Sequence, residues 1–367
     1  MTTNKAGPLA GVRIVEFDAI GPVPLAAMLL ADLGCEIVRI TRAPNSGQTW
    51  GETGGAVLNR NRHHVHLDLK SPADRDRALA LIGAADGLIE GFRPGVMERL
   101  GLGPDECLAR NPRLVFARMT GWGQTGPLAQ RAGHDINYIA ITGVLHAMGS
   151  PDRPPAPPLN LVGDYGGGAM FAIVGLLSAI ISAGKTGVGQ VVDVAMTDGT
   201  AALSSFFHAF RANGLWSDER GANLLDGSKP FYRCYACADG GHVAVGALEP
   251  QFFAKLVEGL GLGPDRFVQY DPAGWAEMEA VFAEVFLTRS RDDWDAVFRD
   301  TDACVSPVLS FGEAADHPHN RDRATLVDQG GVIQPAPAPR FSQSPTGIDE
   351  GRRGLVSVDE ALALWAD

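Results

Sequence analysis

Short apolar runs alternate with amphipathic stretches in the first part of the chain. Apolar residues dominate five short runs and predict strands at 12–17, 36–40, 65–69, 87–90 and 114–119. Helices are predicted between them, one over 24–33 that Gly34 closes and one that Ser71 and Pro72 open. Repeated strand–helix alternation implies a parallel sheet covered on both faces, so we expect a Rossmann-like α/β domain.

The pattern changes in the second half of the chain. After a proline-rich break, a long apolar helix is predicted from about Gly166 to Ala183, and a strand at 190–194 completes the sheet. Two strand-like runs then flank Ala238-Asp239-Gly240-Gly241, which predicts a β-hairpin, and amphipathic helices follow at 250–260 and 275–286. This succession is typical of a smaller α+β domain.

These patterns divide the chain into four parts. We expect a large α/β domain over 1–197, a linker over 198–224, a small α+β domain over 225–330, and a C-terminal segment over 331–367 that returns to the large domain. A chain of 367 residues is longer than one typical core fills, so two domains suit its length.

Composition and charge narrow the classes of partner and compartment. A formal net charge of −12 argues against a general nucleic-acid or anionic-membrane binder. A small anionic ligand needs a local basic pocket, for which the cations between Arg39 and Lys70 are candidates. Five cysteines without framework spacing favour a reducing compartment, and we expect a cytoplasmic protein. The apolar stretch 166–183 contains four glycines, so we interpret it as a buried helix rather than a membrane span.

Two familiar motifs are present but lack their context. Gly121, Gly123 and Gly126 spell the dinucleotide fingerprint, yet Pro127 and a polar stretch follow where a helix must begin. Cys234 and Cys237 lie on a predicted strand, where an offset of three sends side chains to opposite faces. We therefore expect neither a nucleotide cofactor nor a metal site.

Three ionisable residues stand beside glycines or helix starts. His134 follows Gly133 before a helix-like stretch, Asp164 lies between glycines at the start of the apolar helix, and Glu249 precedes a helix after the hairpin. Helix capping, with Asp135 as the cap of the first helix, is the ordinary structural explanation for each. Three consecutive glycines after Asp164 are costly in a helix, and close approach of a ligand to the backbone is one reason to tolerate them.

Five longer motifs resemble those of a known protein family. They are ARMTGWGQTGPLAQRAGHDINYIAITG (117–143), PPLNLVGDYGGG (157–168), GQVVDVAM (189–196), GALEPQF (246–252) and DACVSPVLSFGE (302–313). Together, and in this order, they resemble the α-methylacyl-CoA racemases of the family III CoA-transferase superfamily, closest to bacterial forms of the mycobacterial type. The resemblance covers essentially the whole chain. One departure is Asp18, where relatives usually carry a small or uncharged residue, so the polarity of the acyl pocket is in question.

The resemblance implies a racemase that interconverts (R)- and (S)-2-methylacyl-CoA thioesters through an enolate. It implies that His134 and Asp164 are the acid/base pair on opposite faces of the α-carbon, and that Glu249 pairs with the histidine. It also implies that the backbone N–H of Asp135 helps to hold the enolate oxygen. CoA is part of the substrate, and no separate cofactor is implied.

The resemblance further implies a CoA site and an assembly. The CoA-binding residues would be Arg42, Leu67, Asp68, Leu69, Lys70, Gly91, Phe92, Arg93, Arg99, Gly133, Asn137 and Tyr138, in which arginines suit phosphates and adenine. Family members form interlocked homodimers, so Glu249 would reach His134 across the subunit interface.

Two other functions stay open at this point. A family III CoA-transferase would use the Asp164 carboxylate as a nucleophile that forms an aspartyl anhydride. A non-catalytic acyl-CoA-binding protein would keep the arginines without needing all three ionisable groups. His134 favours the racemase, because a transferase has no need of a second proton-transfer group at that place.

Overall fold

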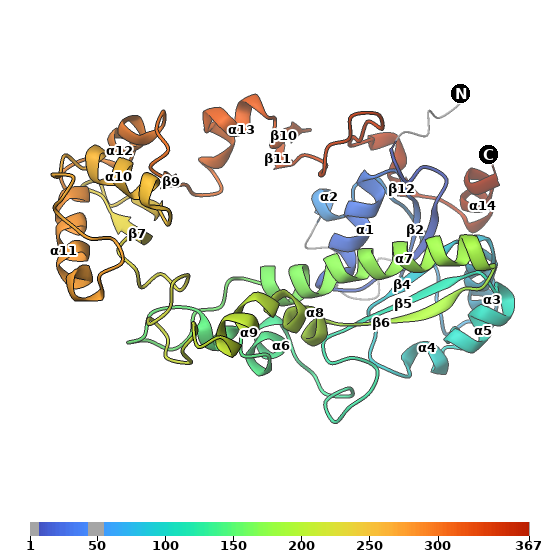
Figure 1. Ribbon diagram of the computed structural model, residues 1–367. Helices are drawn as coiled ribbons and strands as arrows, with labels where there is room; N and C mark the ends of the chain where they lie inside the picture. Colours follow the sequence, from blue (N-terminus) through green and yellow to red (C-terminus); the bar gives the residue numbers. More distant parts are fainter. Residues whose placement is uncertain (1–6, 43–54, 367) are drawn as a thin grey trace. The chain divides into compact units, whose positions relative to one another are not determined.

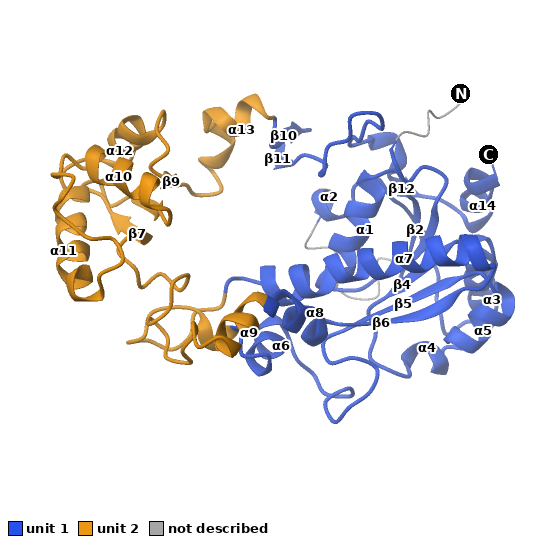
Figure 2. Cartoon of the chain, in the orientation of Figure 1, with its two compact units in different colours: residues 1–144, 158–205, 324–367 blue, residues 145–157, 206–323 orange. Residues whose placement is uncertain are grey.

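The computed structural model describes residues 7–42 and 55–366, which divide into two compact units (Figure 2). Unit 1 takes in residues 1–144, 158–205 and 324–367, and unit 2 takes in 145–157 and 206–323. The segment expected to be a linker, 198–224, is therefore shared between the two units. It contains the end of helix α8 (Met196–Leu203) and all of α9 (Ser205–Ala212).

A seven-stranded parallel sheet forms the centre of unit 1 (Figure 1). Its order is β12-β3-β2-β1-β4-β5-β6, and every neighbouring pair is parallel. The strands are β1 (Arg13–Phe17), β2 (Glu36–Thr41), β3 (His63–His66), β4 (Gly87–Glu90), β5 (Val115–Thr120), β6 (Gln190–Ala195) and β12 (Gly354–Leu355). From β3 to β6 this is the 3-2-1-4-5-6 order of doubly wound sheets, which confirms the predicted α/β class.

Successive residues of the central strands serve two different cores. Ile14 of β1 packs in a cluster with α1 (Pro22–Asp32) and α7 (Met170–Thr186). Its neighbour Val15 packs in a second cluster on the other face, where the helices are α3 (Pro72–Ala84), α4 (Val96–Arg99), α5 (Pro104–Arg110) and α14 (Val358–Ala366). Strands buried on both faces explain the continuous apolar runs in the sequence.

The glycines after Asp164 bring two helices together. They lie in π-helix η4 (Leu161–Ala169), which continues directly into α7. A Cβ atom on Gly167 would lie 2.6 Å from Thr200 Oγ1, and one on Gly199 would overlap with the carbonyl oxygen of Gly167. The glycines therefore allow η4 and α8 to touch backbone to backbone. The approach of a ligand is not what requires them.

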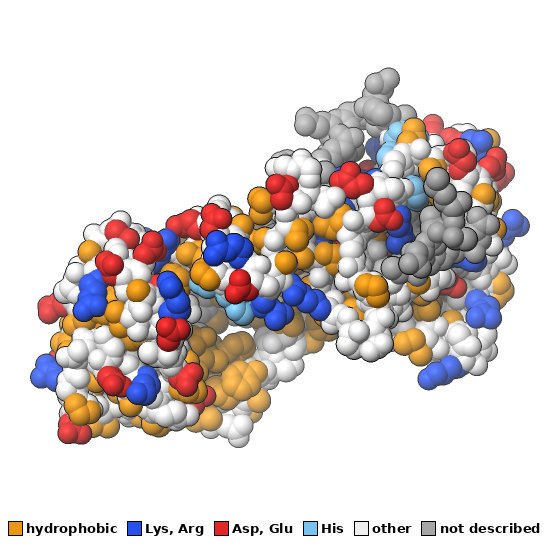
Figure 3. Space-filling view, turned by 90° about the horizontal axis from the view of Figure 1, so that it is seen from above, with side chains coloured by type: hydrophobic (Ala, Val, Ile, Leu, Met, Phe, Trp, Pro, Cys, Tyr) orange, Lys and Arg blue, Asp and Glu red, His pale blue; other side chains and the backbone are white. Residues whose placement is uncertain are grey.

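Helix α7 has an apolar outer face. The segment Leu161–Thr186 is long and apolar enough to cross a membrane by length and composition alone. Ala172, Leu176 and Ala179 pack on the sheet, but Val174 and Ile181 are 63% and 60% exposed. The prediction of a buried helix is therefore wrong for this outer face. On the face drawn in Figure 3, other hydrophobic side chains also lie open between charged side chains of both signs.

Unit 2 is built around an antiparallel three-stranded sheet of order β7-β8-β9. The predicted hairpin is confirmed as β7 (Tyr232–Ala236) and β8 (His242–Gly246), and β9 (Val305–Val308) pairs with β8. Helices α10 (Pro250–Gly259), α11 (Trp275–Phe286) and α12 (Arg291–Phe298) bury an aromatic core against it. Helix α13 (Pro318–Asp322) precedes the return to unit 1.

The last segment of the chain is fastened to unit 1 by buried polar residues. It contains β10 (Leu326–Gln329), β11 (Val332–Pro335), β12 and α14. Arg60, which follows α2 (Gly55–Leu58), is 1% exposed and donates to Asp32 Oδ1 at 3.0 Å, Gln334 Oε1 at 2.9 Å and the Pro335 carbonyl at 2.7 Å. Asn61 adds a hydrogen bond to the Gly347 carbonyl at 2.9 Å. A buried cation with all these acceptors holds the returning segment in a single place.

Candidate active site

A cavity of about 910 Å³ opens in unit 1 at the carboxyl ends of the parallel strands. It is lined by residues that follow β1 (Ile20 to Pro22), β4 (Gly91 to Pro94) and β5 (Gly121 and Trp122), and by Met196 after β6. Strands β1 and β4 are neighbours whose connections leave in opposite directions. Ligands of doubly wound sheets bind at such a switch point, so this is the candidate active site.

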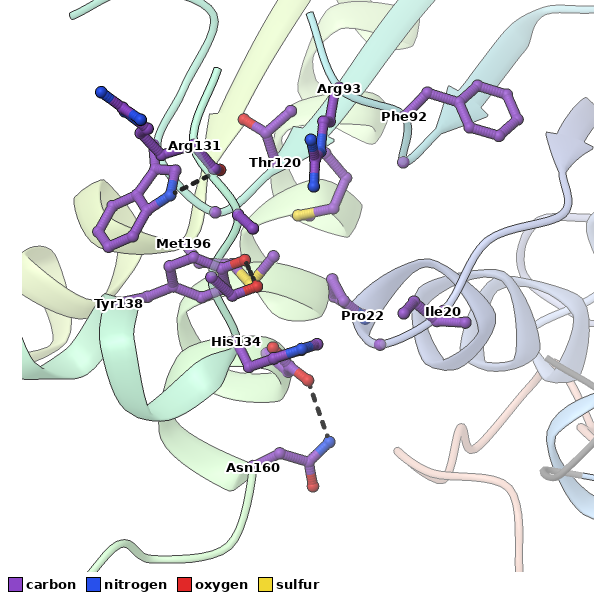
Figure 4. Close-up of a pocket in the computed structure, with 18 of the residues that line it drawn as sticks. Ile20, Pro22, Phe92, Arg93, Thr120, Arg131, His134, Tyr138, Asn160 and Met196 are labelled. Carbon is purple, nitrogen blue, oxygen red and sulfur yellow. Dashed lines mark hydrogen bonds between the residues drawn. The ribbon is translucent and has the colours of Figure 1, made fainter. Parts of the chain in front are cut away.

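His134 enters this cavity from the start of helix α6 (Asp135–Ile141), as Figure 4 shows. It is the N-cap residue of α6, a place that the sequence had assigned to Asp135. The Asn137 side chain accepts the His134 N–H at 3.0 Å, and the Tyr138 hydroxyl donates to the Gly133 carbonyl. A Cβ atom on Gly133 would lie 2.7 Å from the Tyr138 ring. Hydrogen bonds and packing therefore fix the backbone on both sides of the histidine.

Asp164 reaches the same cavity from inside π-helix η4. Its Oδ2 accepts from Asn160 Nδ2 at 3.2 Å, the bond drawn beside His134 in Figure 4. Burial raises the pKa of Asp164 above its ordinary value. The Asn160 hydrogen bond lowers this pKa, the Asp135 charge raises it, and nearby His134 lowers it. The cavity thus brings the His134 imidazole together with a carboxyl group that protonates more readily than usual.

Part of the expected CoA site also lines the cavity. Gly91, Phe92, Arg93, Gly133 and Tyr138 belong to the lining. A Cβ atom on Gly91 would lie 2.9 Å from Ala19 Cβ, so the turn after β4 can pass this close to the connection between β1 and α1 only with glycine. In Figure 4 the Arg93 side chain extends towards the middle of the cavity. Arg93 is therefore the expected CoA ligand that is best placed to meet an anion inside it.

The other expected CoA residues lie away from the cavity lining. The side chain of Leu67 is buried in the second hydrophobic cluster, which leaves only its backbone for a ligand. Asp68 accepts the N–H of Lys70 at 3.0 Å in an exposed turn, and Leu69 packs partly against the same cluster. Arg42 and Arg99 are exposed at the surface of unit 1. The Asn137 side chain already accepts a hydrogen bond from the His134 backbone N–H.

Glu249 lies in unit 2, as the N-cap residue of α10. The sequence had placed it just before a helix, and the structure agrees. Burial raises the pKa of the Cys304 thiol, and the charge of Glu249 raises it further.

A buried carboxylate supports the loop that carries Arg93. Glu90, which is fully buried, accepts the Phe92 N–H at 2.7 Å and Arg118 Nε at 3.0 Å. Arg118 also donates to Glu98 at 2.7 Å. Burial raises the pKa of Glu90 to about 7, although the Phe92 and Arg118 hydrogen bonds act against it. The chain Glu90–Arg118–Glu98 fixes the direction in which the loop leaves β4.

Asp18 does not make the cavity polar. Its carboxylate binds the Arg39 guanidinium, and it is absent from the cavity lining. Sequence reasoning missed several residues that do line the cavity, among them Asn160, Trp122, Arg131 and Met196. Asn160 is the N-cap residue of η4, four positions before Asp164, but the helix predicted from about Gly166 gave no reason to pair the two. Trp122 and Arg131 lie in the loop between β5 and α6, Met196 begins α8, and none of the three left a local signal.

The comparisons with known proteins bear directly on this site. The model of CoA-transferase family III matches residues 9–352. The chain belongs to CoA-transferase family III. The α-methylacyl-CoA racemases of Mus musculus and Homo sapiens are 45% and 42% identical to this family member, over 92% of this chain and 87% of each relative.

A solved structure agrees with the fold. The crystal structure of a CAIB/BAIF family protein from Brucella suis is 25% identical, with a TM-score of 0.80, and the match covers 98% of this chain and 99% of that chain. The predicted family is confirmed, and a family III enzyme of CoA thioesters is consistent with a large cavity that contains Arg93.

Proposed function

We propose that the protein is an α-methylacyl-CoA racemase that interconverts (R)- and (S)-2-methylacyl-CoA. The observation that carries the proposal is that His134 and Asp164, from different elements, line one cavity. Inversion at a carbon needs one group to remove the proton from one face and another to return a proton to the opposite face. Relatives at 45% and 42% identity that are named α-methylacyl-CoA racemases support the same reaction.

The electrostatics of Asp164 suit this reaction. Because burial raises its pKa, the carboxyl group can hold a proton closer to neutral pH than an exposed aspartate can. In one direction Asp164 removes the α-proton and His134 donates one, and in the other direction the roles exchange. The thioester oxygen carries negative charge in the enolate between these steps. The backbone N–H of Asp135, at the positive end of α6, supplies a donor for it, and such donors are typically worth about 3 kcal/mol.

The CoA part of the substrate would be held by cations and backbone groups. Arg93 and the turn Gly91-Phe92 contact it inside the cavity, with Gly133 and Tyr138 beside the thioester. Arg42, Arg99 and the segment 67–70 serve the outer part of CoA, the segment chiefly through Lys70 and backbone groups. Arginine suits phosphate because its planar fork donates two parallel hydrogen bonds.

The active assembly would be an interlocked homodimer. In it, Glu249 of the partner subunit pairs with His134. The exposed Val174 and Ile181 on α7 support an assembly, because apolar side chains on one helix face need a cover.

A family III CoA-transferase is the second candidate function, because Asp164, a carboxylate that can attack a thioester, lines the cavity of a family member. The two functions differ in the fate of the thioester bond. A transferase passes CoA to an acceptor acid through an aspartyl anhydride, whereas a racemase leaves the bond intact and exchanges the α-proton.

Incubation of the full-length protein with (S)-2-methylacyl-CoA in D₂O tests the proposal. We expect both epimers, deuterium at the α-carbon, and no acyl transfer to added carboxylic acids, as followed by NMR and chiral chromatography. His134→Ala and Asp164→Ala should abolish epimerisation while acyl-CoA still binds. His242→Ala, an exposed histidine on β8, is the matched control. CoA transfer without α-exchange would overturn the racemase in favour of the transferase.

A further inference from the structure

The carboxylate of Asp135 joins the two elements that carry the candidate proton-transfer groups. Asp135 is the first residue of α6, directly after His134, and is 7% exposed. Its Oδ1 accepts the backbone N–H of Asp164 at 2.7 Å. A side chain next to one catalytic candidate therefore binds the backbone of the other.

The N–H of Asp164 needs this outside partner. It lies in the first turn of π-helix η4, where N–H groups have no carbonyl of their own helix to bind. The next N–H, of Tyr165, already reaches the Asn160 carbonyl at 3.2 Å. Without Asp135, a part-buried donor would lose its acceptor, which is unfavourable because its hydrogen bond is not replaced.

The neighbouring glycine leaves room for this bond. A Cβ atom on Gly163 would lie 2.5 Å from Asp135 Oδ1 and 3.0 Å from Ile139 Cγ2. Any side chain at position 163 would therefore push the carboxylate or α6 away. The glycine at position 163 and the carboxylate at position 135 are therefore both needed for this contact.

We propose that the Asp135 carboxylate is a positioning residue that holds Asp164 at a fixed place relative to His134. The inference rests on the proposed racemisation and deepens it. The two proton-transfer groups must stand on opposite sides of one carbon, and a displacement of about 1 Å can cost roughly 100-fold in rate. One hydrogen bond between their two elements sets this separation.

The charge of Asp135 has a separate effect from its hydrogen bond. It raises the pKa of Asp164, which also responds to burial, to Asn160 on its own helix and to His134 at the start of α6. The negative charge of Asp164 also adds to the effect of burial in raising the pKa of the Tyr138 phenol, in α6. Removal of the Asp135 charge should lower the pKa of Asp164 whether or not an acceptor for its N–H remains.

Two substitutions separate the bond from the charge. Asp135→Asn keeps an oxygen that accepts from Asp164 and removes the charge, whereas Asp135→Ala removes both. In the direction in which Asp164 removes the proton, both variants should move the acidic limb of kcat/KM to lower pH. Asp135→Ala should lower kcat by roughly 10- to 100-fold with KM little changed, and Asp135→Asn should keep most of the wild-type kcat.

Backbone amide exchange gives a readout that does not depend on activity. We expect the Asp164 amide to exchange faster in Asp135→Ala than in the wild type, and Asp135→Asn to keep most of its protection. Gly163→Ala should also speed this exchange. Gly184→Ala, in α7 where an added Cβ meets nothing within 4 Å, is the matched control and should not.

The outcomes distinguish the two proposals. Wild-type kcat and wild-type Asp164 exchange in Asp135→Ala would overturn the positioning role. If the wild type shows no α-proton exchange, the racemase fails, and the amide measurement alone still decides whether Asp135 holds Asp164. If Asp135→Ala does not fold, Asp135→Asn and Gly163→Ala carry the same comparison, and unchanged Asp164 exchange in Gly163→Ala would overturn the inference.

Discussion

At the scale of single residues, Asn160 counteracts the effect of burial on Asp164. Burial raises the pKa of Asp164, and the Asn160 hydrogen bond lowers it. Asn160→Ala should therefore raise this pKa further. In the direction in which Asp164 must be ionised to take the proton, the acidic limb of kcat/KM should move to higher pH. A pH–rate profile in each direction measures this, and an unmoved limb would contradict the assignment of Asp164 as base.

The raised pKa of Glu90 predicts that the stability of the protein depends on pH. Its pKa in the folded protein is about 7, against 4.5 for the ordinary carboxyl group, so the folded state binds more protons between these values. The stability that this group contributes is present below about pH 4.5 and is lost as the pH rises through 7. At about 1.4 kcal/mol per pH unit, the change is roughly 3 kcal/mol.

Glu90→Gln tests this effect because it removes the titrating group and keeps an acceptor for Phe92. Urea unfolding at a series of pH values should show a shallower fall in the free energy of unfolding between pH 4.5 and 7 than in the wild type. Asp239 is the matched control, an exposed carboxylate whose pKa is lowered by backbone hydrogen bonds. Asp239→Asn should leave the slope in this range as it is. An unchanged slope in Glu90→Gln would show that Glu90 is ionised throughout.

Part of the candidate site could be predicted from the sequence, through the family resemblance rather than from single residues. Helix capping explained His134 and Asp164 on their own, the resemblance made them catalytic candidates, and the cavity brings both together. Glu90 and Arg118 gave no such signal, because a charged residue inside a strand becomes meaningful only when its buried partner is known. The role of the Asp135 carboxylate depends on a contact between residues 29 positions apart, which spacing cannot reveal.

At the scale of elements, η4 and α8 lie so close together that we expect one added methyl group between them to lower the stability strongly. A Cβ atom on Gly199 would overlap with the Gly167 carbonyl, which is backbone and cannot rotate away. Gly199→Ala should lower the free energy of unfolding by at least about 1–3 kcal/mol. It should also lower racemisation, because η4 carries Asp164.

Gly184→Ala again serves as the control, since it adds the same methyl group to a helix with open space around it. It should be neutral or slightly stabilising, because alanine favours helix by about 1 kcal/mol over glycine. Thermal and chemical unfolding of the two variants measure the difference. Equal stability of both variants would mean that η4 and α8 can separate at little cost.

Helices and strands were largely predictable where one periodicity dominates. The strands β1, β2, β4 and β5 lie within one or two residues of the apolar runs that predicted them. Strand β3 begins two residues earlier and ends sooner than expected, at His63–His66, because histidines interrupt its apolar pattern. The π-helical start of α7 was not predictable, because it depends on the close approach of α8 to the glycines.

At the scale of the whole molecule, the proposed homodimer predicts that charge on the outer face of α7 prevents assembly. Val174→Asp and Ile181→Asp should shift the protein towards monomer and abolish racemisation, because each active site would lose Glu249 of the partner subunit. Lys185→Glu, on an exposed position of the same helix, is the control and should remain a dimer. Light scattering coupled to size exclusion measures the mass. Full activity in a proven monomer would contradict the shared site.

The division into units was predictable in outline but not in its boundaries. The change from strand–helix alternation to a hairpin with helices falls within unit 2, and each unit has a hydrophobic core of its own. Residues 145–157 belong to unit 2 although the sequence placed them in the large domain. This boundary depends on contacts between distant segments, which the sequence does not show. One example is the hydrogen bond from Arg220 to the Arg153 carbonyl at 3.1 Å.

The return of the last segment to unit 1 sets an order of events during synthesis. Strand β12 covers the edge of β3, and Val358 and Trp365 fill the core beside α3. Because the chain leaves the ribosome from its N-terminus, we expect this edge and core to stay open until residues 206–323 have been made. The nascent chain thus carries an unpaired strand edge through most of its translation, a state in which chaperones or neighbouring nascent chains can bind it.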